Sequence, residues 1–161
     1  MAEDAQYVTL GVAEERFAVP VERVQEILQV QRIARMPNAP PYFLGIIDVR
    51  GRSIPVVDLR LKLGLAAGQD TENTRIIVLR IDVEGRDVTI GLKTDRVFEV
   101  TLLDGDLEPP PEIGTLWRSD CIAGLGRRNG VFVTVLDLNR FFAAAETALV
   151  GAVAESRHCA A

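Results

Sequence analysis

Few side chains in this sequence have the type and spacing that catalysis requires. The single histidine, His158, lies near the C-terminus among small and polar residues, where a general base is poorly held against a nucleophile. None of the serines lies in a Gly-x-Ser-x-Gly turn. Cys121 and Cys159 are far apart and do not cluster with histidine, as a zinc site requires. We therefore expect a protein that is not an enzyme and that uses no cofactor and no metal ion.

One glycine-rich segment has some features of a phosphate-binding loop. It reads Gly-Leu-Gly-Arg-Arg-Asn-Gly over 124–130 and misses the dinucleotide-binding spacing by one residue. The segment that follows, 131–136, has the apolar pattern of a strand, whereas a phosphate loop leads into a helix. Asn129 and Gly130 between two apolar runs are typical of a hairpin turn. We therefore interpret this segment as structural.

The charge balance limits the partners that the chain can bind. Its 161 residues include 23 acidic and 18 basic side chains, for a net charge of −5. A nucleic-acid binder needs a surplus of lysine and arginine, so this class is disfavoured. The apolar runs are short and interrupted by charges, so no membrane span and no direct membrane contact are expected. Two cysteines fit a reducing compartment, and we expect a cytoplasmic protein.

The elements that must position any site are mostly short strands. Alternating and β-branched runs bounded by turn residues predict the hairpins and strands. A helix is expected after Pro20, because Val21, Val24, Ile27 and Leu28 fall on one helical face. The predicted strands are 7–12, 16–19, 30–33, 75–83 and 88–92, the predicted hairpins are 45–58 and 122–136, and the other helical segments are 59–63 and 138–149.

The chain contains an internal repeat. Residues 19–27 align with 92–100 at an offset of 73, and residues 45–59 align with 124–138 at an offset of 79. The matched pairs are Arg23 with Arg96, Val24 with Val97, Glu26 with Glu99, Gly45 with Gly124, and Gly51 with Gly130. Because the two blocks occur in the same order, chance alignment of valine-rich strands is the weaker interpretation.

The repeat predicts a mainly β fold of two small barrels of about five strands, related by a pseudo-twofold axis. Each barrel alone would have a marginal core, so a shared interface is expected, and a groove at that junction is the default binding place. We expect a single domain over 7–142. Its subdomains would span about 16–68 with C-terminal elements, and about 74–138; the tail 151–161 is expected to be disordered.

Several segments have a family's order and spacing: 24–27, 37–45, 49–51, 54–60, 90–92 with Asp95, Val97 and Val100, then 122–124 and 135–138. Together they resemble the CheW-like coupling proteins of bacterial chemosensory arrays. The resemblance extends from about Tyr7 to Phe142, with its motifs in the family's order and spacing. It implies two intertwined SH3-like barrels and a non-catalytic adaptor. The implied partners are the cytoplasmic helical hairpin of chemoreceptors and the regulatory domain of the chemotaxis histidine kinase. The implied location is at membrane-bound receptor arrays.

The resemblance also implies a receptor-binding groove. Val24, Val97 and Val100 match groove positions, and burial of each valine against a receptor helix would contribute roughly 1.5 kcal/mol. The alternative is that all three are ordinary core residues. Arg50 matches a functional position before the hairpin glycine, and Glu26 is expected to pair with it.

Other positions carry a structural interpretation or depart from the family. Gly45, Gly51 and Gly91 are interpreted as residues required by backbone geometry. Asp58 and Asp137 are interpreted as caps or turn residues. The departures are Asp48, Lys93 and Arg96, which could alter the choice of partner. The competing hypothesis is a double β-barrel that binds a small molecule or single-stranded nucleic acid.

Overall fold

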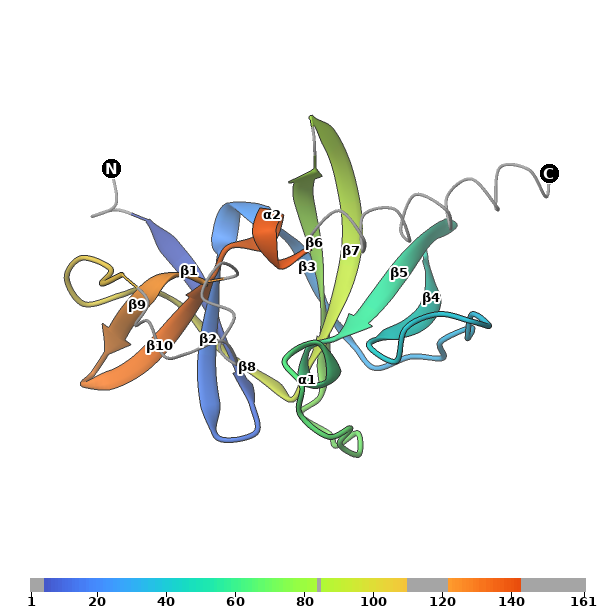
Figure 1. Cartoon of the computed structure of the whole chain (residues 1–161), viewed down its shortest axis with the longest axis horizontal. Coiled ribbons are helices and arrows are strands. Elements are labelled where there is room, and N and C mark those ends of the chain that lie inside the picture. Colours follow the sequence, from blue (N-terminus) through green and yellow to red (C-terminus); the bar gives the residue numbers. More distant parts are fainter. Residues whose placement is uncertain (1–4, 84, 110–121, 143–161) are drawn as a thin grey trace.

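The structure is a computed structural model and describes residues 5–83, 85–109 and 122–142. These residues form two five-stranded sheets that lie side by side (Figure 1). The first sheet has the order β8 (Arg96–Leu102), β1 (Gln6–Val12), β2 (Glu15–Pro20), β10 (Val131–Leu136), β9 (Ile122–Arg128). The second has the order β3 (Val24–Gln29), β6 (Arg75–Val83), β7 (Arg86–Thr94), β5 (Arg52–Asp58), β4 (Phe43–Val49). The helical elements are η2 (Val21–Arg23), α1 (Leu59–Lys62) and α2 (Leu138–Phe141).

The internal repeat explains this topology. Strands β1 to β5 of the first repeat correspond in order to strands β6 to β10 of the second. When each strand of the first sheet is replaced by its counterpart in the other repeat, the strand order of the second sheet results. The parallel pairing of β2 with β10 matches the parallel pairing of β7 with β5. Each repeat contributes two strands to one sheet and three to the other. The predicted mainly β fold with two related five-stranded units is therefore confirmed.

The exchange of strands corrects the predicted subdomain boundaries. Segments 16–68 and 74–138 each contribute strands to both sheets, so 16–68 with C-terminal elements does not make up one unit and 74–138 does not make up the other. The physical reason is that the hairpin that opens each repeat pairs with the strands of the other repeat. Because the two units share strands, neither can bury its apolar face without the other.

The prediction of a helix after Pro20 is also wrong. Only one 3-10 turn forms, η2, and Val24 begins an extended strand that pairs with β6. Along β3, half-buried and exposed residues alternate, which is the period of a strand at a sheet edge. Residues 30–33 form no strand, although Ala34 makes a single bridge to Ile46. Of the expected helix 138–149, α2 ends at Phe141, and 143–149 lie outside the described residues, as does the tail 151–161.

The caps of the two short helices follow the repeat. The Asp58 carboxylate accepts a hydrogen bond from the Arg60 backbone N–H, and Asp137 accepts one from the Arg140 N–H. Both aspartates therefore act as N-caps, as interpreted from the sequence. Gly64, with φ of +84°, directly follows the first of these turns. The two helical turns occupy equivalent places at the ends of β5 and β10.

The largest core lies between the two sheets. It contains buried side chains from both, including Leu10 of β1, Leu79 of β6 and Leu92 of β7. The last residue of α2, Phe141, and the following Phe142 complete it. This shared core fixes the two sheets relative to each other and positions the edge strands β3 and β8. Within the described residues, no helix is long and apolar enough to cross a membrane.

Candidate partner-binding site

Arg50 and Glu26 form a two-point ion pair. The Arg50 guanidinium donates from Nη1 to Oε1 of Glu26 at 3.2 Å and from Nη2 to Oε2 at 2.5 Å. The Arg50 side chain is 74% exposed, whereas that of Glu26 is 26% exposed. The pair connects edge strand β3 to the turn between β4 and β5. The pairing expected from the sequence is therefore present, and its outer member stands at the molecular surface.

The β4–β5 turn holds Arg50 in place through its backbone. Arg50 has φ of +52° and Gly51 has φ of +82°, the left-handed pair of a tight hairpin turn. The Asp48 carboxylate accepts a hydrogen bond from the Gly51 N–H at 2.8 Å. Asp48, a departure from the family pattern, thus stabilises the turn that presents Arg50.

Two other glycines are explained by close packing. A Cβ at Gly45 would lie 2.1 Å from the Ala34 carbonyl oxygen, and its φ is +145°. A Cβ at Gly91 would lie 2.9 Å from Cγ2 of Ile76. The single bridge between Ala34 and Ile46, which brings the segment after β3 against β4, therefore depends on Gly45.

A bulge in β8 determines where its valines point. Val97 is opposite Leu10 and Val100 is opposite Val8 of β1, with a register shift at Phe98. Since Leu10 and Val8 are buried on the same face of β1, the two valines share the face of β8 that looks toward the core. Val97 packs against the shared core, whereas Val100 is 52% exposed.

Val24 occupies the equivalent place on β3. It is opposite Leu79 and packs against the same core as Val97. Ile27 was not among the residues expected in the groove, and it is opposite the buried Ile77 yet 41% exposed. The signal was available, because the offset of 73 aligns Ile27 with Val100. Leu102, 44% exposed near the end of β8, was also missed.

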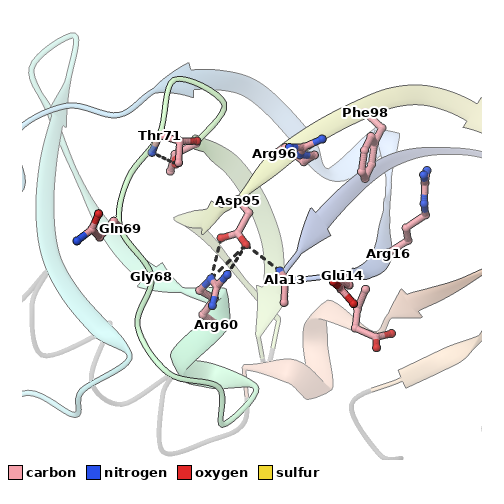
Figure 2. Close-up of a pocket in the computed structure, with 12 residues that line it drawn as sticks. Ala13, Glu14, Arg16, Arg60, Gly68, Gln69, Thr71, Asp95, Arg96 and Phe98 are labelled. Carbon is pink, nitrogen blue, oxygen red and sulfur yellow. Dashed lines mark hydrogen bonds and ion pairs between the residues drawn. The ribbon is translucent and has the colours of Figure 1, made fainter.

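A cavity of about 420 Å³ lies elsewhere, beside the β1–β2 and β7–β8 turns (Figure 2). None of the five residues expected in the groove lines it. On one wall, the Asp95 carboxylate accepts hydrogen bonds from Nε and Nη2 of Arg60, at 2.9 and 2.8 Å. It also accepts one from the Ala13 backbone N–H at 2.7 Å. These contacts connect α1, the β1–β2 turn and the start of β8.

The environment of Asp95 keeps it ionised. Partial burial raises its pKa, but the hydrogen bonds from Arg60 and Ala13 outweigh this effect, so that the pKa lies below its usual value. The same hydrogen bond raises the pKa of Arg60. For Asp58, burial raises the pKa despite the helix-capping hydrogen bonds. Within the described residues, no group of His, Cys, Asp and Glu side chains is arranged to hold a metal ion.

Comparison with known proteins identifies the family that shares this architecture. The family model described as the CheW-like domain matches residues 6–146. The protein "Chemotaxis protein CheW" of Helicobacter pylori is 32% identical over 133 residues, covering 81% of this chain and 77% of that protein. Its namesake in Klebsiella aerogenes is 28% identical over 152 residues, covering 94% and 89%. The crystal structure of the scaffolding protein TtCheW from Thermoanaerobacter tengcongensis superposes with a TM-score of 0.77 at 27% identity, covering 88% and 90%.

Proposed function

The chain belongs to the CheW-like domain family of chemotaxis signalling adaptors, and from this premise we propose that it couples chemoreceptors to a histidine kinase without catalysing a reaction itself. The proposed partners are the cytoplasmic helical hairpin of a chemoreceptor and the regulatory domain of the kinase. The protein would act in the cytoplasm at membrane-bound receptor arrays. The comparisons favour this adaptor role over a barrel that binds a small molecule or single-stranded nucleic acid.

The observation that best supports the receptor site is the placement of apolar side chains on the two edge strands. Val24 and Ile27 on β3, and Val97 and Val100 on β8, stand opposite buried core residues of the neighbouring strands. One member of each pair packs on the core and the other is more than 40% exposed. A receptor helix that covers the exposed members would gain apolar burial continuous with the core.

The Glu26–Arg50 pair would supply the polar part of this surface. Glu26 lies on β3 between Val24 and Ile27, and it anchors the guanidinium of Arg50 by two hydrogen bonds. Because Arg50 is largely exposed, its remaining N–H donors can reach carbonyl or carboxylate oxygens of a partner. An anchored guanidinium loses less side-chain freedom on binding than a mobile one.

Reconstitution tests the proposal. The protein would be combined with a chemoreceptor cytoplasmic fragment and the cognate kinase, and the rate of kinase autophosphorylation would be measured with and without each component. We expect activation only when receptor, kinase and this protein are all present. Equal kinase activity in the absence of this protein would contradict the adaptor role. Binding of the receptor fragment to this protein alone, measured by calorimetry, separates the receptor site from the kinase site.

A further inference from the structure

Beside the cavity of Figure 2, two arginines flank one exposed aromatic ring. The Cζ atom of Arg16 lies 4.3 Å from the centre of the Phe98 ring, and that of Arg96 lies 5.8 Å from it. Phe98 is 38% exposed, and all three side chains line the cavity. They come from the start of β2 and from β8. We call Arg16, Phe98 and Arg96 the arginine–phenylalanine cluster.

The ring is held by the backbone beneath it. A Cβ at Gly11 would lie 2.9 Å from Cε2 of Phe98, so the glycine leaves room for the ring against β1. The bulge in β8 turns Phe98 onto the outer face of the sheet, away from the face that carries Val97 and Val100. The cluster therefore lies on the other face of β8 from the proposed receptor surface.

Three carboxylates line the same cavity as the two guanidinium groups, those of Glu14, Glu15 and Asp95. In the part of the chain that the structure describes, neither Arg16 nor Arg96 forms an ion pair with a carboxylate. Asp95, which precedes Arg96, accepts its hydrogen bonds from Arg60 and from the Ala13 N–H, and the charge of Arg96 adds to the lowering of its pKa. Two like charges beside one ring repel each other, and an anion between them would relieve that repulsion.

The fold itself does not require this cluster. At the offset of 73, Phe98 corresponds to Gln25 and Arg16 corresponds to Thr89 in the second sheet. The pairing of β3 with β6 has a register shift at Gln25, equivalent to the one at Phe98, so the bulge forms there without an aromatic ring. Only Arg96 has an arginine, Arg23, at the equivalent position. Arg96 is also one of the departures from the family pattern. An exposed aromatic ring beside two arginines is thus a feature of one barrel that its repeat equivalent does not share.

We propose that the arginine–phenylalanine cluster and the adjoining cavity bind an acidic peptide segment of a partner protein. An arginine beside an aromatic ring keeps N–H donors available for bidentate hydrogen bonds to carboxylates, and Arg16 is the closer of the two, at 4.3 Å from the ring centre. Clusters of arginine are a recurring device for acidic motifs. The cavity is open to solvent, and Thr71 and Gln69 also line it and can hydrogen-bond peptide groups.

This binding is independent of the proposed receptor site, because it uses the opposite face of β8. The probe is an acetylated and amidated hexaglutamate peptide, titrated into the full chain at low ionic strength by fluorescence anisotropy. Hexaglutamine serves as the uncharged control. We expect saturable binding of hexaglutamate alone, weakened by added salt. Equal binding of both peptides, or no binding of hexaglutamate, would overturn the proposal.

Substitution identifies the groups that bind. We expect the double variant Arg16→Gln/Arg96→Gln to bind hexaglutamate at least tenfold more weakly. The matched control is Arg127→Gln/Arg128→Gln, which removes the same charge from arginines that lie beside Glu108 and Glu99. The control should bind within twofold of the wild type. An equal loss in both double variants would show non-specific attraction and overturn the proposal.

A measurement on the unaltered protein keeps the test independent of variant folding. In two-dimensional NMR spectra of the isotopically labelled wild type, hexaglutamate should shift the backbone amides of Arg16, Arg96 and Phe98. The Arg side-chain Nε–H signals of both residues should shift as well. If the largest shifts map to other strands, the acidic segment binds elsewhere and the proposal fails.

Discussion

Arg50 and Asn129 occupy equivalent turns and have the same backbone conformation, with φ of +52° and +53°. Each is followed by a glycine, Gly51 or Gly130, with φ near +80°. Asparagine adopts this left-handed conformation more readily than arginine. The turn itself therefore does not require arginine at position 50. What distinguishes Arg50 is its guanidinium, which is bonded to Glu26 at the surface.

The first prediction follows from this equivalence. Arg50→Asn should retain the turn while removing the guanidinium, so the free energy of unfolding should change by no more than about 0.5 kcal/mol. Arg50→Ala should cost no more than about 1 kcal/mol, because the ion pair is exposed. Both variants should lower receptor-dependent kinase activation in the reconstituted mixture. Normal activation by both folded variants would make Arg50 a structural residue only.

The second prediction concerns the coupling of Arg50 with Glu26. If the two side chains act as a unit, Glu26→Ala and the double variant should be as defective in kinase activation as Arg50→Ala alone. The matched control is the pair Arg128 and Glu99, which is 3.5 Å apart at the corresponding turn of the first sheet. Kinase activation rates for all single and double variants give the coupling energy. Additive losses at Glu26 and Arg50 would show that they act separately.

The sequence predicted those parts of the fold that depend on local signals. The hairpin at Asn129–Gly130, the caps Asp58 and Asp137, and strand 75–83 all have short-range causes, namely turn chemistry, capping and an unbroken apolar run. The repeat predicted two related five-stranded units. The exchange of strands between repeats could not be predicted, because it depends on which hairpin pairs with which distant strand. No local pattern encodes that choice.

The same distinction applies to the site. The Glu26–Arg50 contact could be expected, since both residues lie in motifs of known family placement. The helical periodicity of Val21, Val24 and Leu28 was misleading, because pairing with β6 overrides local propensity. The exposure of Ile27 and Val100 depends on β3 and β8 being edge strands, which only the assembled sheets show. The position of Phe98 depends on a bulge that has no signature in the sequence.

The third prediction compares two glycines with positive φ. Gly45→Ala should lower the free energy of unfolding by at least about 3 kcal/mol, since strain adds to a clash with the Ala34 carbonyl. Gly51→Ala should lower the free energy of unfolding by only about 1–2 kcal/mol, because nothing lies within 4 Å of a Cβ added at that position. Urea denaturation measures both values. An equal loss of unfolding free energy at the two positions would contradict the close approach of the Ala34 carbonyl to Gly45.

The fourth prediction concerns pH. The pKa of Asp95 is lower in the folded protein than its usual value of 3.8 in an unfolded chain. Its stabilising contribution is therefore complete above the unfolded pKa and is lost as the pH falls through the folded pKa. Asp95→Asn should reduce the free energy of unfolding by about 1–2 kcal/mol at pH 7. The difference from the wild type should shrink as the pH falls below about 4.

Asp58→Asn is the control for that experiment, since burial raises the pKa of Asp58. Here protonation favours the folded state, so the wild type should gain stability relative to Asp58→Asn as the pH falls through the folded pKa toward the unfolded one. Asparagine also caps helices well, so the helical turn should persist. Thermal melting from pH 3 to 7 measures both series. A constant difference between wild type and Asp95→Asn across this range would contradict the assigned ion pair.

The fifth prediction separates receptor binding from packing on β8. Val100 is 52% exposed, so Val100→Ser removes little buried surface and should change the free energy of unfolding by less than about 0.5 kcal/mol. If a receptor helix covers this side chain, the substitution should weaken binding of the receptor fragment by roughly 1 kcal/mol or more, about a fivefold loss. Val131→Ser is the matched control, because Val131 is a 45% exposed valine on a different strand. It should leave receptor binding unchanged. Calorimetric titration of the receptor fragment into each variant decides the matter, because equal affinities for Val100→Ser and Val131→Ser would place the receptor helix away from β8.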